Sequence, residues 1–148
     1  MKARLRAISS LSTQEWLQFA QAWILLFFID LSLRVFSFRK VYRWLSSAQP
    51  SQIFTSETQI DTAIRQYSAV VASAARHHLY PMTCLRRALA LKWLLSKRGV
   101  QTELRFGVRR EAGNLDAHAW LEYRNAPIGE TVPPDAQYQQ LKSDRVTH

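Results

Sequence analysis

The chain has 148 residues, 47% of them hydrophobic, which is enough for one domain with a hydrophobic core and too few for two independent domains of usual size. Twenty Lys and Arg against eleven Asp and Glu give a net charge of +9, and no carboxylate lies between Asp61 and Glu103. The single cysteine excludes an intramolecular disulfide, and the N-terminus lacks a signal peptide's cleavable end, so we expect a cytoplasmic protein.

The excess positive charge does not by itself identify a partner. A basic surface can attract nucleic acid, anionic lipid or an acidic peptide. The sequence contains no zinc-ligand spacing, glycine-rich phosphate loop, RNP-like aromatic motif or helix-turn-helix signature. We therefore expect no nucleic-acid partner, no cofactor and no metal.

The most hydrophobic segment spans residues 16–38, and Thr13 is placed to begin a helix there. Its longest unbroken apolar run, residues 22–29, is much shorter than the about twenty residues that cross a bilayer. Asp30 and Arg34 follow at a spacing that lets them pair on one helix face. We predict a buried, membrane-surface or partner-docking helix within an N-terminal helical segment, residues 1–50. Its end is marked by three cations, Arg39, Lys40 and Arg43.

A second unit, residues 51–148, is predicted to follow a connection over residues 48–55 that contains Pro50. Ser56 and Gln59 have the form of a capping box, and apolar residues at three- and four-residue intervals predict a helix over about 57–79. Pro81 interrupts this pattern.

A further helix is predicted from Thr83 to Lys97 or Arg98, ended by Gly99. Cys84 heads the apolar stripe of this helix, whereas the cations fall on the other side. The stripe continues through Ala88, Leu91 and Leu95, and the opposite side carries Arg86 and Lys97.

After Gly99 the apolar period changes to two, which is typical of half-buried strands. The pattern predicts strands over 100–108, 117–123 and 128–132, a loop over 109–115, and a loosely held polar tail beyond Asp135. In the second strand His118, Trp120 and Glu122 share one face. The predicted fold class is α+β, with the helix that carries Cys84 packed on a small antiparallel sheet.

Cys84 is the candidate nucleophile. The unpaired N–H groups and dipole of its helix start favour a thiolate, and so do Arg86 and Arg87. Nucleophilic catalysis also needs an imidazole and an acceptor that orients it. A hairpin loop centred on Arg124, with one residue on each side, would place His118 directly opposite Glu130. An even loop length shifts that pairing.

Each of these residues also has a structural interpretation. Cys84 could be a small core residue, His118 a satisfied strand histidine, and Glu130 an edge-strand charge. Asp116 and Glu122 share the parity of His118 and are lesser candidates for orienting its ring.

Three further side chains have interpretations that need no chemistry. Trp120 could wall the site from water or fill the core. His77 and His78 lie at the end of the first core helix, where cations are favourable, and no carboxylate or thiol stands at ligand spacing. We expect a solvated helix end there and not a metal site.

The stretch CLRRALALKWLLSKRGVQTELRFGV, followed by DAHAWLEYRNAPIGE, resembles the transglutaminase-like cysteine protease domain of lasso-peptide biosynthesis B proteins, the leader peptidases. The resemblance covers about residues 55–132 and implies a transglutaminase/papain-like core. It also implies that Cys84 is the nucleophile, His118 the general base and then acid, and Glu130 the group that holds the imidazole. Related sequences often carry aspartate at the position of Glu130.

The implied reaction is hydrolysis of one amide bond, which releases the leader from a ribosomally made precursor peptide. The chain is too short for a fused leader-recognition domain, and its first fifty residues look helical. The resemblance therefore implies a separate leader-recognition partner protein and a downstream ATP-dependent macrolactam synthetase. We expect docking through residues 16–38, which could also contact a membrane surface, or through the basic stretch between Asp61 and Glu103.

Two other functions fit the sequence. A transglutaminase-like Cys-His-acid site can also transfer its acyl group to an amine. Alternatively, the chain is a non-enzymatic basic adaptor that binds nucleic acid or a membrane surface, with Cys84 in its core.

Overall fold

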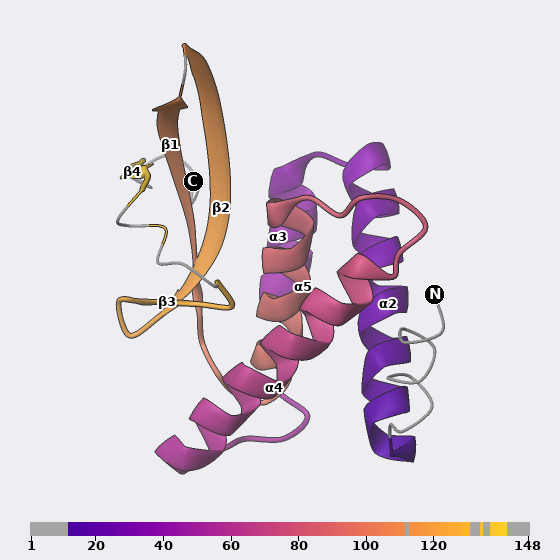
Figure 1. Ribbon diagram of the computed structural model, residues 1–148. Coiled ribbons are helices and arrows are strands. Elements are labelled where there is room, and N and C mark those ends of the chain that lie inside the picture. The colour runs from indigo at the N-terminus through magenta and orange to yellow at the C-terminus, as the bar shows by residue number, and fades with distance from the viewer. Residues whose placement is uncertain (1–11, 112, 131–133, 135–136, 142–148) are drawn as a thin grey trace.

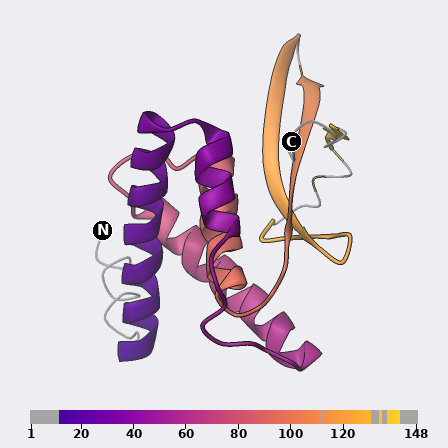
Figure 2. The same cartoon turned by 180° about the vertical axis from the view of Figure 1, so that it is seen from behind.

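A computed structural model describes residues 12–111, 113–130, 134 and 137–141, and these residues form four helices and a small antiparallel sheet. Figure 1 shows how they are arranged. The helices are α2 (Thr13–Val35), α3 (Phe38–Ser46), α4 (Glu57–Arg76) and α5 (Cys84–Ser96). The strands are β1 (Glu103–Glu111), β2 (Asn114–Tyr123), β3 (Ala126–Ile128) and β4 (Gln139–Gln140), in the order β3-β2-β1-β4. The helices lie together on one side of the sheet (Figure 2), which confirms the predicted α+β class.

Helix α2 begins at Thr13, as predicted, because Ser12 and Glu15 form a capping box. The Ser12 hydroxyl accepts the Glu15 N–H at 3.3 Å, and the Glu15 carboxylate accepts the Ser12 N–H at 2.8 Å. The chain turns extended at Phe36 and Ser37, so the basic residues that follow belong to a separate helix, α3. The expectation that Arg39, Lys40 and Arg43 close the first helix is therefore wrong.

Helix α4 starts where the sequence predicted, but the predicted capping box is wrong. Ser56 is the N-cap residue, and its side chain makes no capping hydrogen bond. The helix ends at Arg76, short of the predicted residue 79. Helix α5 then begins at Cys84 after Thr83, and Gly99 follows it with φ of 76°, the left-handed conformation expected of a residue that ends a helix.

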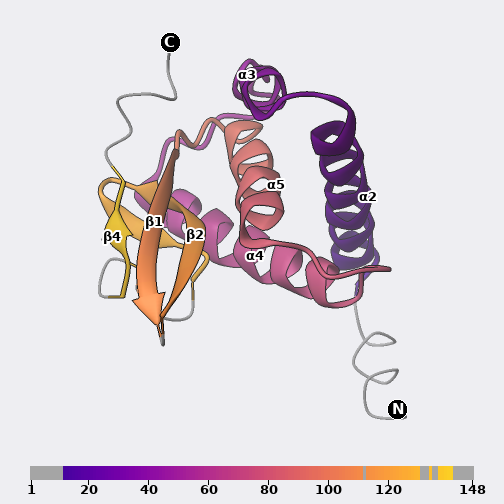
Figure 3. The ribbon, with the colours of Figure 1, turned by 90° about the horizontal axis from the view of Figure 1, so that it is seen from above.

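Helix α5 is the centre of the fold. It packs against α2, α3 and α4 as well as β1 and β2, and Figure 3 shows it between α2 and the sheet. One buried apolar cluster joins all these elements, and burying a large aliphatic side chain contributes about 1.5–3 kcal/mol. The predicted stripe is confirmed because Ala88, Leu91 and Leu95 are all buried. The start of α5 is therefore fixed by packing on several sides.

Strands β1 and β2 form a longer hairpin than predicted. Arg109 pairs with Asp116 and Glu111 with Asn114, so most of the predicted loop over 109–115 is strand. The turn needs few residues because Gly113 takes φ of 86°. Strand β1 begins at Glu103 and not at residue 100.

The β2–β3 hairpin has a two-residue turn, Arg124 and Asn125, with φ of 51° and 62°. Tyr123 therefore pairs with Ala126 and Leu121 with Ile128, one residue away from the predicted register. Strand β3 ends at Ile128, so the prediction of a strand over 128–132 is wrong as far as the described residues reach. Residues 131 and 132 lie outside them.

Part of the tail belongs to the sheet. Strand β4 pairs with β1, with Gln140 opposite Gly107, and the Leu141 N–H donates to the Phe106 carbonyl at 2.8 Å. The prediction of a loosely held tail is therefore wrong for residues 138–141. Residues 135, 136 and 142–148 lie outside the described part of the chain.

Candidate active site

Cys84 is the first residue of α5 and is partly buried at the margin of the core. Thr83, the N-cap residue, makes no side-chain capping bond, and its hydroxyl accepts Arg86 Nη1 at 3.3 Å. Among the described residues, Thr83 therefore leaves the first N–H groups of α5 without a side-chain cap, and these groups point out of the helix end that Cys84 begins. This is a suitable place for an anion that forms at the sulfur or beside it.

His118 and Glu130 lie together, although not through the predicted pairing. His118 Nε2 is 3.3 Å from Glu130 Oε2, with the two side chains 21% and 24% exposed. Glu130 follows the end of β3, so direct strand opposition does not bring it there. Because Nε2 faces the carboxylate, Nδ1 is the ring nitrogen left to exchange a proton with another group.

Gly129 explains how Glu130 reaches His118 in the shifted register. Its φ of 76° is a left-handed conformation that redirects the chain directly after β3. A Cβ at this position would lie 2.9 Å from Leu91 Cδ2 and 3.4 Å from Ser68 Oγ. The glycine therefore serves both the turn and the close packing of this segment on α5 and α4.

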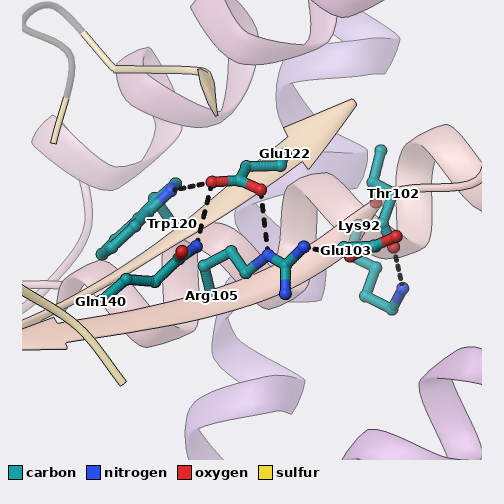
Figure 4. A network of polar contacts seen from close by, with 7 residues as sticks. All are labelled: Lys92, Thr102, Glu103, Arg105, Trp120, Glu122 and Gln140. Carbon is teal, nitrogen blue, oxygen red and sulfur yellow. Dashed lines mark hydrogen bonds and ion pairs between the residues drawn. The ribbon is translucent and has the colours of Figure 1, made fainter. Parts of the chain in front are cut away.

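Glu122, a lesser candidate for orienting His118, serves a different group. Its carboxylate accepts Trp120 Nε1 at 3.2 Å, Arg105 Nε at 2.9 Å and Gln140 Nε2 at 3.3 Å, as Figure 4 shows. Trp120 is only 1% exposed, and its ring centroid lies 6.1 Å from that of His118 in a stacked arrangement. Glu122 therefore fixes Trp120, which in turn forms one wall beside the imidazole.

Asp116, the other lesser candidate, also bonds to a residue other than His118. Its Oδ2 accepts the Tyr138 hydroxyl at 2.8 Å and Arg109 Nε at 3.1 Å. The Tyr138 hydrogen bond outweighs the effect of desolvation and, with Arg109 and the nearby His118, lowers the pKa of the Asp116 carboxyl below its ordinary value. Asp116 is therefore a carboxylate at neutral pH.

Tyr138 is a site residue that the sequence did not indicate. Its ring stacks on His118 with centroids 5.1 Å apart and an interplanar angle of 25°. The hydrogen bond to Asp116 and desolvation raise the pKa of the phenol, and the charge of Cys84 adds a smaller effect in the same direction. Tyr138 thus borders the imidazole. Among the described residues no hydrogen bond joins the Cys84 thiol to His118.

The start of α5 is also tied to α2 by charge. Asp30 is 2% exposed, and its two oxygens lie 2.8 Å from Arg34 Nε and 2.6 Å from Arg86 Nε. The predicted pairing of Asp30 with Arg34 is confirmed, and Arg86 joins it. Burial acts to raise the pKa of Asp30, but the Arg34 hydrogen bond and the charges of Arg86 and Arg34 outweigh it, so this pKa lies below its ordinary value.

The stretch between Asp61 and Glu103 is less of a free basic surface than its composition suggests. Lys92 is buried at 5% exposure and donates to the Thr102 carbonyl at 2.7 Å (Figure 4). Burial lowers the pKa of Lys92. Arg86 faces the buried Asp30, and Arg98 donates to Tyr67. These three cations are therefore used inside the fold.

His77 and His78 pack against α2 beyond the end of α4. His77 is exposed, and its Nδ1 lies 2.8 Å from the Ser73 carbonyl, while the His78 ring stacks on Trp23 at 4.6 Å. Within the described part of the chain, no three His, Cys, Asp or Glu side chains are grouped as metal ligands.

Helix α2 leaves much of its apolar surface uncovered. Only 28% of its most hydrophobic window is buried, and by length and composition the helix could cross a membrane. Its exposed apolar side chains recur at helical spacing and include Leu17, Ile24, Phe28, Leu31 and Val35, which we call the α2 stripe; they are between 46% and 67% exposed.

Comparison with known proteins identifies a family for this chain. The sequence model described as the Transglutaminase-like superfamily matches residues 25–143. No curated protein and no solved structure matches the chain.

Proposed function

The chain belongs to the Transglutaminase-like superfamily, whose members are generally cysteine peptidases or transferases, and we propose that this protein is a leader peptidase of lasso-peptide biosynthesis. It would hydrolyse the amide bond between leader and core of a ribosomally made precursor. The family match covers α3, α4, α5 and the sheet, together with residues 25–35 of α2. The finer assignment rests on the resemblance of the segments around Cys84 and His118 to that group.

The observation that carries the proposal is the contact of His118 Nε2 with Glu130 Oε2 at 3.3 Å, on a strand that packs against the helix headed by Cys84. A carboxylate on one ring nitrogen fixes the ring orientation and stabilises the imidazolium, so that the other nitrogen can exchange a proton with the thiol. Glu130 takes this part although related sequences often carry aspartate there.

The proposed reaction has two halves. The Cys84 thiolate attacks the scissile carbonyl, and the resulting oxyanion accepts hydrogen bonds from the uncapped N–H groups that begin α5. The intermediate collapses to a thioester as His118 protonates the departing amine of the core peptide. Water then gives a proton to His118 and attacks the thioester, which releases the leader as a carboxylate and restores the thiol.

The test mixes the protein with the precursor peptide encoded near its gene and with the small protein encoded beside it, the candidate leader-recognition partner. The masses of the products are then measured by mass spectrometry. We expect two fragments whose masses sum to precursor plus water. Both Cys84→Ala and Cys84→Ser should lose at least about a thousandfold in rate. If a folded Cys84→Ala variant cleaves like the wild type, Cys84 is a core residue and the peptidase proposal fails.

A matched pair of carboxylate variants tests the role of Glu130 in holding the His118 imidazole. Glu130→Gln should lower the cleavage rate about ten- to a hundredfold, because an amide does not stabilise the imidazolium. Glu57→Gln is the control, since Glu57 is exposed and pairs with Arg124. Equal rates for the two variants would remove Glu130 from the mechanism. Adding a small amine distinguishes hydrolysis from acyl transfer. Acyl transfer would give a leader amide whose mass exceeds that of the hydrolysed leader by the mass of the amine minus one water.

We propose that the α2 stripe receives the separate leader-recognition protein, in a cytoplasmic assembly that passes the core peptide to an ATP-dependent macrolactam synthetase. The stripe carries no charged side chain, so it suits an apolar partner surface. Deleting the N-terminal segment, residues 1–50, would remove core residues such as Leu26 and Leu45, so substitutions in the α2 stripe are the better test.

The triple variant Ile24→Gln, Phe28→Gln and Leu31→Gln should weaken binding of the neighbouring small protein at least about tenfold. Leu79→Gln is the control, because Leu79 is exposed and lies outside the stripe. If partner binding is unchanged and the triple variant instead loses binding to anionic lipid vesicles, the stripe contacts a membrane surface and the partner proposal fails.

A further inference from the structure

The C-terminal part of the described chain carries an aromatic residue into the site and holds it on both sides. The Tyr138 N–H donates to the Pro134 carbonyl at 2.8 Å. On its other side β4 pairs with β1, which places Gln140 opposite Gly107. Tyr138 is therefore anchored through its backbone before any side-chain contact is considered.

The ring of Tyr138 covers the imidazole. Its centroid is 5.1 Å from that of His118, and Trp120 stacks at 6.1 Å with an interplanar angle of 18°. Together with Glu130 on Nε2, these two rings restrict the rotation of the imidazole. A histidine that must pass a proton between fixed partners benefits from such restriction, because a small misplacement lowers the rate strongly.

The hydroxyl of Tyr138 is fixed as well. It donates to Asp116 Oδ2 at 2.8 Å, and Arg109 both donates to that carboxylate and lies over the tyrosine ring, with Cζ 4.9 Å from its centroid. A charged acceptor and a cation over the ring hold the phenol in one orientation.

The strand beneath leaves room for this arrangement. Gly107 is the cross-strand partner of His118. A Cβ on Gly107 would lie 2.8 Å from Tyr138 Cβ and 2.9 Å from two carbons of the Trp120 ring. Any side chain at this position would push Tyr138 or Trp120 away from the imidazole.

We propose that Tyr138 is a positioning residue of this site: its ring, together with Trp120 and with Glu130 on Nε2, holds the His118 imidazole in the orientation that leaves Nδ1 to exchange a proton. The inference rests on the proposed function, in which His118 moves the proton. Asp116, considered above for orienting His118, acts instead through Tyr138.

The test compares Tyr138→Ala, Tyr138→Phe and Gly107→Ala with the wild type. Tyr138→Ala removes the stacked ring and should lower kcat about tenfold or more with KM changed less than about twofold. Tyr138→Phe keeps the ring and should retain at least about a third of kcat. Gly107→Ala should resemble Tyr138→Ala. Trp44→Ala is the control, because Trp44 is an exposed aromatic on α3.

A second readout does not need activity. The carbon-bound imidazole protons of His118, followed by NMR, feel the ring current of the stacked tyrosine. Their shifts should move in Tyr138→Ala, stay near the wild-type values in Tyr138→Phe, and not change in Trp44→Ala. The same spectra show whether each variant is folded.

The outcomes separate the two proposals. Unchanged His118 shifts in a folded Tyr138→Ala variant, or a kcat within about twofold of the wild type, would overturn the positioning role. If the wild type cleaves no precursor while the His118 shifts follow the expected pattern, the proposed function fails and the structural placement of Tyr138 stands.

Discussion

The turn at Gly129 offers a sharp test of how the fold delivers Glu130 to His118. Replacing Gly129 by alanine forces a side chain into a left-handed conformation, at roughly 1–2 kcal/mol. The new Cβ would also lie 2.9 Å from Leu91 Cδ2, and Leu91 is itself buried and cannot withdraw freely. Overpacking of this kind typically costs about 1–3 kcal/mol. We expect Gly129→Ala to lower the free energy of unfolding by about 2–5 kcal/mol in total.

Gly113→Ala is the matched control. Gly113 also has a positive φ, 86°, but no atom of the described residues lies within 4 Å of the Cβ it would gain. Gly113→Ala should lower the free energy of unfolding only by the roughly 1–2 kcal/mol that backbone strain costs. It should keep full cleavage activity. Denaturant titration measures the stability of both variants, and the precursor assay measures their rates. The reasoning is refuted if both lose the same stability and Gly129→Ala cleaves at the wild-type rate.

Two buried charges give further predictions. Asp30→Asn should cost about 3 kcal/mol, because it leaves Arg86 without a countercharge, whereas the exposed Asp61→Asn should change little. The Asp30 contribution, measured by urea titration, should be complete above about pH 4 and lost as the pH falls through the lowered pKa of the folded state. The lowered pKa of Lys92 predicts an effect at alkaline pH. The free energy of unfolding should rise as the pH increases from this lowered pKa to the ordinary pKa of lysine, because the unfolded state then binds more protons. Lys92→Met should remove that alkaline increase in thermal melts.

Local sequence was enough to place Cys84 and His118 on the correct elements. Pro81 and Gly99 bracket a helix of apolar period, so Cys84 had to lie near its start, and the structure begins α5 at that residue. The alternation in β2 assigned His118 and Trp120 to one face, and both now lie in the same aromatic stack. Each inference depends on neighbours close in sequence, whose conformational preferences tertiary contacts did not override.

The β2–β3 register could not be predicted in the same way. Arg124 and Asn125 both take positive φ. Of these two residue types only asparagine commonly adopts that conformation, so arginine gave no signal for a two-residue turn. The expected pairing of His118 with Glu130 was reached through a register that the structure contradicts. The contact survives because Gly129 redirects the chain after β3.

Long-range polar contacts set the remaining limit. Asp30 and Arg86 are far apart in sequence, and nothing local marks Arg86 as the partner of a buried carboxylate instead of a solvated helix charge. Tyr138 is the more instructive case, because it lies in a polar tail with no periodicity. Its place follows from β4 joining β1 beside a glycine that leaves space for the ring. Gly107 was the available signal: a glycine inside an alternating strand commonly marks the close approach of another part of the chain.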